Sequence, residues 1–259
     1  MNATLREKDE AAIEKYNNAR DSYKQAKDAY KDARSDWIAA RDQYRTSRNA
    51  TAGAGALEKA KDFLLKADDA MIRHLEVLKA RVETTRNLDE SEKNDILADI
   101  DADIEWLENK KSDIENAQTR QELSDISKTI REKWGEIRAY VKKVTGEILC
   151  AKIDRVIEKL DNVSERADAK IQGLKDAGKD TANAEALLAD FNSKIDLAKE
   201  KNDLAKDRFD EISDIQDADK LFTEGHGFIK EANEYLRNAH KTLKEIVREL
   251  RGSGNRTIE

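Results

Sequence analysis

Residues 119–178 read TRQELSDISKTIREKWGEIRAYVKKVTGEILCAKIDRVIEKLDNVSERADAKIQGLKDAG, and this stretch decides the fold. Thr119 and Glu122 form a Thr-x-x-Glu capping box, which starts a helix, and Gly178 is the residue type that commonly ends one. Between them apolar residues recur every three or four positions, without a proline. One helix over this stretch would be roughly 85 Å long at 1.5 Å per residue, more than one compact domain covers. We therefore expect its two halves to pack against different partners.

The composition predicts an all-α protein. Charged residues make up 40% and hydrophobic residues 38% of the 259 positions, and proline is absent, as in long-helix and coiled-coil proteins. The apolar residues are periodic, which argues against disorder. The net charge of -7 argues against a nucleic-acid partner. No apolar run is long enough for a membrane-spanning segment.

Residues 1–50 predict a long helix with an aromatic residue every seven positions. These residues are Tyr16, Tyr23, Tyr30, Trp37 and Tyr44, and a small residue follows each of them three positions later. Such a heptad pattern is typical of a seam that lets a neighbouring helix approach closely. Two interpretations stay open. The seam packs on the chain's own body, or it forms an exposed face for self-association, a protein partner or a ligand.

The segment 51–56 contains two glycines among small residues, so we expect it to be a linker where the chain reverses or hinges. A docked N-terminal helix would then lie antiparallel to the helix that follows. After the linker, helices are predicted over residues 57–86, 90–117, 120–178, from about 181, and from about 217 to 251.

These helices predict two tandem antiparallel three-helix bundles that share the long central helix, in an elongated molecule. We expect the first bundle over 57–146, the second over 147–252 and a flexible tail over 253–259. An internal repeat supports this plan, because Ile96-Leu-Ala-Asp-Ile100 matches Leu187-Leu-Ala-Asp-Phe191. With the N-terminal helix docked alongside, the first bundle would contain four helices.

This layout resembles tandem spectrin-type repeats, in which the last helix of one bundle continues into the first helix of the next. The resemblance lies in the architecture and in no spectrin-specific residue pattern. The segments Ala67–His74 and Ile96–Trp106 are also similar to those of uncharacterised helical surface proteins of archaea. Neither resemblance implies catalytic or binding residues.

Four Asn-x-Ser/Thr sequons, the acceptor motif for N-glycosylation, begin at Asn2, Asn49, Asn162 and Asn255. They favour a secreted or cell-surface protein, although coincidence in a polar chain would explain them equally well. The alternative location is cytoplasmic, and the lone Cys150 does not discriminate between the two.

Motifs for chemistry are absent, and we expect no catalytic, cofactor-binding or metal-binding residues. The di-iron motif Glu-x-x-His does not occur at any of the three histidines. The acidic residues Asp99, Asp101, Asp103 and Glu105 alternate along a helix and would point in different directions. Cys150 is interpreted as a small packed residue, with a reactive thiol as the alternative.

Gly225-His226-Gly227 interrupts the last helix, and close helix packing, or a ligand or proton-sensing role for His226, could explain it. For the whole chain, the sequence favours a non-enzymatic structural or interaction protein, an acidic helical rod that acts as spacer, scaffold or assembly subunit. The alternative function is a helical-bundle binding module for a small apolar ligand.

Overall fold

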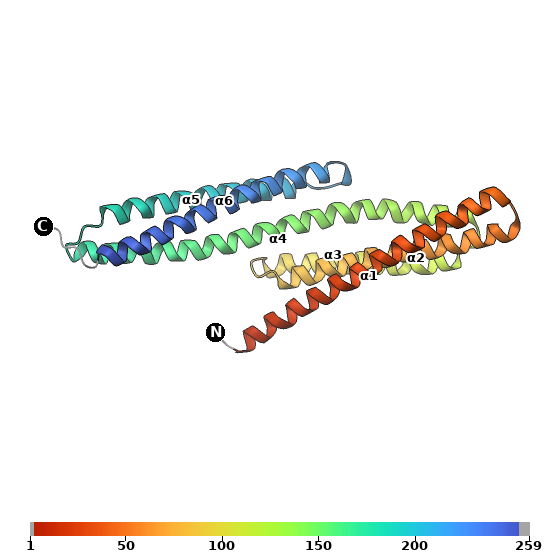
Figure 1. The fold of residues 1–259 in the computed structure, drawn as a ribbon, viewed down its shortest axis with the longest axis horizontal. Coiled ribbons are helices and arrows are strands. Elements are labelled where there is room, and N and C mark those ends of the chain that lie inside the picture. Colours follow the sequence, from red (N-terminus) through yellow and green to blue (C-terminus); the bar gives the residue numbers. More distant parts are fainter. Residues whose placement is uncertain (1–2, 254–259) are drawn as a thin grey trace. The chain divides into compact units, whose positions relative to one another are not determined.

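The computed structural model describes residues 3–253, which form six α helices and no strand (Figure 1). This confirms the predicted all-α class. The helices are α1 (Ala3–Ser47), α2 (Ala50–Thr84), α3 (Glu90–Asn116), α4 (Arg120–Asp176), α5 (Ala182–Asp210) and α6 (Ile215–Ser253). Ser253 is the last residue of α6, and the rest of the predicted tail, 254–259, lies outside the described residues.

The chain divides into two compact units. Unit 1 ends at Val141 and unit 2 begins at Lys142, so the boundary falls inside α4. The sequence suggested a boundary after residue 146. The N-terminal helix, predicted as a separate segment over 1–50, belongs to unit 1.

The ends of α4 follow the local signals in the sequence. The backbone N–H of Glu122 donates to Thr119 Oγ1 over 3.2 Å, and the N–H of Thr119 donates to Glu122 Oε2 over 3.1 Å. These two bonds are the predicted capping box. At the other end Gly178 has φ of 71°, and its N–H donates to the carbonyl of Lys175. The predicted glycine stop is therefore confirmed.

The predicted linker over 51–56 is wrong, because these residues are helical and belong to α2. The chain instead reverses at Arg48, where φ is 50°, and at Asn49, whose side-chain oxygen accepts from the N–H of Ala52 over 2.7 Å. This cap satisfies one free donor of the new helix. Alanine, the best helix former, offsets the glycines in between. Gly53 serves a close approach, since a Cβ there would lie 3.1 Å from the ring of Tyr44.

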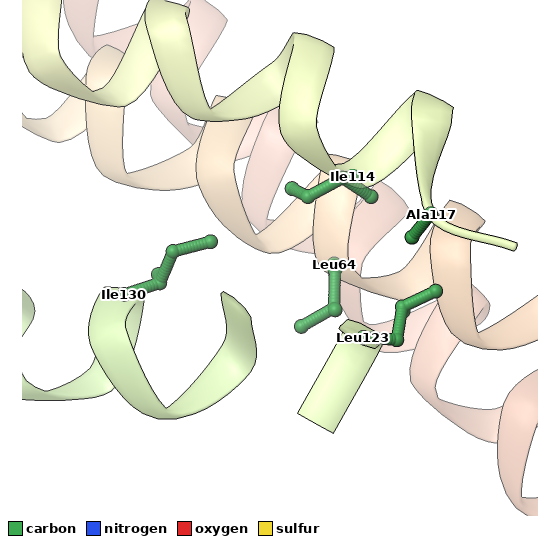
Figure 2. Packing of buried hydrophobic residues seen from close by; sticks show 5 residues of the cluster. All are labelled: Leu64, Ile114, Ala117, Leu123 and Ile130. Atoms are coloured by element: carbon green, nitrogen blue, oxygen red, sulfur yellow. The ribbon is translucent and has the colours of Figure 1, made fainter. Parts of the chain in front are cut away.

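Unit 1 contains α1, α2, α3 and the first part of α4. Helix α1 lies antiparallel beside α2, as the ion pairs of Lys15 with Glu83 and of Asp36 with Lys59 demonstrate (Figure 1). The N-terminal helix is thus docked. A core of buried side chains joins α2, the end of α3 and α4 (Figure 2); it consists of Leu64, Ile114, Ala117, Leu123 and Ile130.

Unit 2 contains the rest of α4 with α5 and α6. Asp161 of α4 pairs with Lys199 of α5, and Lys201 of α5 pairs with Glu231 of α6. Side chains from all three helices fill the interior, and the largest fully buried ones are Ile148, Phe191, Ile195, Phe209 and Ile246. Three helices therefore surround one apolar core.

Candidate functional site

The aromatic residues of α1 lie on the side of the helix that faces the rest of unit 1. All five are half-buried: Tyr16, Tyr23, Tyr30, Trp37 and Tyr44. Of the small residues that follow them, Ala26 and Ala33 are buried. Because these small residues leave room for a close neighbour, the seam packs on α2 of the same chain.

Two aromatic side chains of α2 meet the α1 rings. Phe63 lies between Trp37, stacked at a centroid distance of 5.1 Å, and Tyr30 at 5.4 Å. The ring centroid of His74 lies 4.9 Å from that of Tyr23 and 6.1 Å from that of Trp134 of α4, which it contacts edge-on. Rings from three helices are thus brought together in unit 1.

A groove runs between α1 and α4, with α2 as its floor. Two pockets of about 520 and 350 Å³ make up this groove and share the lining residues Phe63, Leu64, Ser127 and Arg131. The first is also lined by Trp37, Arg41, Tyr44, Ala56, Leu57, Ala60, Arg120, Leu123 and Ser124. The second is also lined by Tyr23, Lys27, Tyr30, Ala67, Ala70, Met71, His74, Ile130 and Trp134. We call both pockets together the aromatic groove.

Helix α4 explains why this groove stays open. Beside the apolar Leu123, Ile130 and Trp134, this helix lines the groove with polar residues at steps of four, three and four, which form one stripe along the helix: Arg120, Ser124, Ser127 and Arg131. In a closed bundle such a stripe is apolar. Long charged and short hydroxyl side chains cannot replace that apolar contact, so the seam between α1 and α4 is left unfilled.

Part of the groove lining is rigid because it also belongs to the core of unit 1. Leu64, Leu123 and Ile130 line the pockets. Figure 2 shows the same three side chains in the core cluster with Ile114 and Ala117. Close-packed core side chains resist displacement. A molecule in the groove would therefore meet a preformed surface.

Every charged side chain that lines the groove is basic, although the chain as a whole carries a net charge of -7. Arg120 lies over the ring of Tyr44, 3.8 Å from its centroid, and Arg41 lies over Trp37 and contacts Asp42. Aromatic faces attract cations, so these two side chains are held against the groove wall. Lys27 and Arg131 complete the basic lining.

Burial lowers the pKa of His74, and the nearby charge of Lys27 lowers it further. The imidazole is therefore neutral at neutral pH. Its Nδ1 atom is enclosed and makes no hydrogen bond to any of the described residues. His74 thus adds an uncharged ring to the apolar floor.

The sequence pointed to the α1 wall of the groove but not to the other walls. Four of the five predicted aromatic residues line the pockets, and Tyr16 does not. A signal for the floor was present as a second small and aromatic stripe on α2, with steps of four and three: Ala56, Ala60, Phe63, Ala67, Ala70 and His74. Ser127 and Arg131 gave no signal, because polar residues on a helix are ordinarily solvated.

Two of the four sequon residues, Asn49 and Asn162, fall within the described residues, and neither lines the groove. Asn49 is the N-cap of α2 and is exposed. Asn162 is exposed within α4, and its Nδ2 donates to the carbonyl of Glu158 over 2.8 Å. Asn2 and Asn255 lie outside the described residues.

The remaining candidates of the sequence are parts of packing contacts and ion pairs. Cys150 is buried, which raises the pKa of its thiol to about 12. In the acidic row, Asp99 accepts from Tyr140, Asp101 pairs with Lys79 and Asp103 pairs with Lys133, so these carboxylates diverge. No group of side chains within residues 10–252 is arranged to hold a metal ion.

The close packing expected around Gly225 is confirmed, since Phe209 fills the space beside it. His226 stacks on Phe222 at 6.1 Å.

None of the six helices, over their described residues, contains an apolar stretch that could cross a membrane.

Comparison with known proteins gives no relative. The chain matches no protein-family model, no curated protein and no solved structure. The similarities to spectrin-type repeats and to archaeal surface proteins stay predictions.

Proposed function

We propose that this protein is a non-enzymatic interaction protein, a helical spacer or scaffold that binds its partner in the aromatic groove of unit 1. The observation that carries this proposal is the polar stripe of α4 opposite the aromatic rings of α1. A seam that served only packing would have apolar residues on both sides. The arginines and serines of α4 instead leave half-buried rings accessible, and such rings are the typical anchors of binding sites.

The side chains around the groove favour binding over catalysis. Ser127 is the hydroxyl nearest the middle of the groove, since it lines both pockets, but His74 makes no hydrogen bond that would activate it. Nucleophilic catalysis needs the hydroxyl and its base within hydrogen-bond reach. The basic lining residues are better suited to holding a ligand than to transferring a proton.

A second candidate function is a binding module for a small apolar ligand. It is favoured by the size of the two pockets, about 520 and 350 Å³, because small-molecule sites in proteins usually have volumes of about 300–1,000 Å³. In this case the groove is the same, and only the class of its occupant differs.

A groove-filling variant tests the proposed function. Ser127→Trp places a large ring in the middle of the groove, while the matched control Ser193→Trp places one on the exposed face of α5 in unit 2. Wild-type protein and the Ser193→Trp variant are expected to retain the same partner from native material, and Ser127→Trp is expected to lose it. Equal retention by all three proteins, with unchanged circular dichroism, would refute the groove as the binding site.

Light scattering separates self-association from binding of another molecule. If the partner is a second copy, the mass of the wild-type protein rises with concentration and that of Ser127→Trp does not. A constant monomer mass for both proteins excludes the second copy as occupant of the groove.

We also propose a secreted or cell-surface location, with a cytoplasmic one as the alternative. The exposed sequon residues Asn49 and Asn162 support it. Treatment of the native protein with an N-glycosidase is expected to increase its gel mobility. Unchanged mobility would count against glycosylation and remove the main argument for this location.

A further inference from the structure

We propose that the ligand of the aromatic groove is a soluble long-chain carboxylate, whose apolar chain lies along the rings and whose head group binds Arg131. This inference rests on the proposed binding function of the groove, in the form of its second candidate, because it requires the groove to bind a small molecule. It adds the chemical class of the occupant.

The shape of the groove indicates an elongated apolar ligand. The two pockets are adjacent along the helices and join at Phe63, Leu64, Ser127 and Arg131, so a ligand can extend from one into the other. Both are lined mainly by aromatic, leucine and alanine side chains. Burial of methylene groups against such side chains is favourable, because it removes apolar surface from water. A chain of methylene groups would therefore gain affinity along the whole groove.

The charges of the groove indicate that the ligand is an anion. All lining charges are positive in a chain that is otherwise acidic, and a cationic ligand would be repelled. Arg41 already contacts Asp42, and Arg120 lies on the ring of Tyr44. Arg131 makes no hydrogen bond or ion pair within the described part of the chain, and it borders both pockets. Its guanidinium can therefore accept a carboxylate as a bidentate partner.

The dimensions favour a small molecule over a helix of a partner protein. A standard protein interface buries about 800 Å² on each partner, whereas the pockets have the volumes of small-molecule sites. We therefore assign the groove to a fatty-acid-like anion. A partner helix is the outcome that the experiment below distinguishes from it.

The test uses the full chain and dodecanoate, with dodecanol as the uncharged ligand of the same chain length. Isothermal titration calorimetry is expected to show one dodecanoate bound for each chain, with a change in the fluorescence of Trp37 and Trp134. Loss of the charged hydrogen bonds in Arg131→Gln should weaken dodecanoate binding by roughly tenfold or more. Dodecanol should bind more weakly than dodecanoate and respond little to this substitution.

Two variants in unit 2 serve as matched controls. Arg166→Gln removes an exposed arginine of α4, and Ser193→Trp adds a ring on α5; neither residue lines the groove. Both variants should bind dodecanoate like the wild-type protein, whereas Ser127→Trp should not bind it. Unchanged circular dichroism of each variant excludes loss of folding as the cause.

Several results would overturn the inference. They are the absence of dodecanoate binding, equal affinity for dodecanoate and dodecanol, and an Arg131→Gln variant that binds as tightly as the wild-type protein. If Ser127→Trp loses a protein partner but wild-type protein binds no dodecanoate, the proposed function stands and the carboxylate is refuted. If Ser127→Trp still binds dodecanoate, the ligand binds outside the groove and the inference fails. If the same variant also retains the partner from native material, the proposed function is refuted as well.

Discussion

The ring of Phe209 in α5 lies so close to Gly225 in α6 that a Cβ atom at Gly225 would be only 2.6 Å from its Cε1 atom. A Cβ atom at Gly146 of α4 would lie even closer to the same ring, 2.2 Å from Phe209 Cγ. Two glycines from two helices thus form the slot for one buried phenylalanine. This slot explains why α6 tolerates a glycine on its buried side.

Gly225→Ala is expected to destabilise unit 2, although alanine is the better helix former. Overpacking against a buried ring costs about 1–3 kcal/mol, which exceeds the gain in helix propensity of about 1 kcal/mol. Gly227→Ala is the matched control, because no atom lies within 4 Å of its added Cβ. Urea denaturation should give a lower free energy of unfolding for Gly225→Ala and a slightly higher one for Gly227→Ala. Equal stabilisation by both substitutions would contradict the slot.

Asp68 makes the stability of unit 1 dependent on pH. Its side chain is fully buried, and neither carboxylate oxygen has a partner among the described residues. Burial raises the pKa of Asp68 from 3.8 to about 7, against the opposing charge of Lys111 and with small contributions from Asp69 and Glu108. The folded protein therefore holds this proton more tightly than the unfolded chain.

The sign of the effect follows from this difference. The contribution of Asp68 is fully present below the unfolded pKa of 3.8 and is lost as the pH rises through about 7. Since one pKa unit corresponds to about 1.36 kcal/mol, the loss is at most about 4 kcal/mol. Asp68→Asn should flatten the profile of unfolding free energy against pH between about pH 4 and pH 8. A free energy of unfolding of the wild-type protein that rises from pH 4 to pH 8 would contradict this prediction.

Asn202 is a buried polar anchor in unit 2. Its Nδ2 donates to Asp154 Oδ1 over 2.7 Å and to the carbonyl of Cys150 over 3.3 Å, which joins α5 to α4. Asn202→Ala removes the donor of both hydrogen bonds and is expected to lower the free energy of unfolding by about 1–3 kcal/mol. The neighbouring exposed Asp203→Ala should change stability by less than about 0.5 kcal/mol. Similar denaturation midpoints for both variants would show that the bond contributes little.

Cys150 is expected to be unreactive in the folded protein. It is the only cysteine, it is buried, and the pKa of its thiol is raised to about 12, so almost no thiolate is present at neutral pH. An aromatic disulfide reagent should therefore react slowly with the native chain and rapidly after addition of urea. Fast reaction without urea would show that this part of unit 2 opens readily.

Local sequence signals predicted most of the helix ends, because each depends on a few neighbouring residues. The capping box at Thr119 and the glycine stop at Gly178 are of this kind. The linker prediction over 51–56 failed because Gly53 is needed for contact with Tyr44, a residue of another helix. A glycine in a close contact between helices cannot be distinguished from a glycine in a loop by composition alone.

The candidate site was only partly predictable for the same reason. The heptad of aromatic residues on α1 is visible in one segment, whereas the groove requires three helices to be placed together. Arg131 and Ser127 stand in a stripe that the sequence presents as an ordinary solvated face. Asp68 was overlooked because a charged residue is expected outside, and only tertiary packing buries it.

Photo-crosslinking from the middle of the groove tests the central claim most directly. A small diazirine amino acid of about the size of leucine, which leaves the groove open where a tryptophan would fill it, is placed at position 127 and, as control, at position 193; the protein is irradiated in native material, and its mass is measured. We predict a defined adduct from position 127 alone, of a few hundred daltons for a carboxylate or of protein size for a partner helix. The absence of any adduct beyond those formed at position 193 would contradict the claim that the aromatic groove is a binding site.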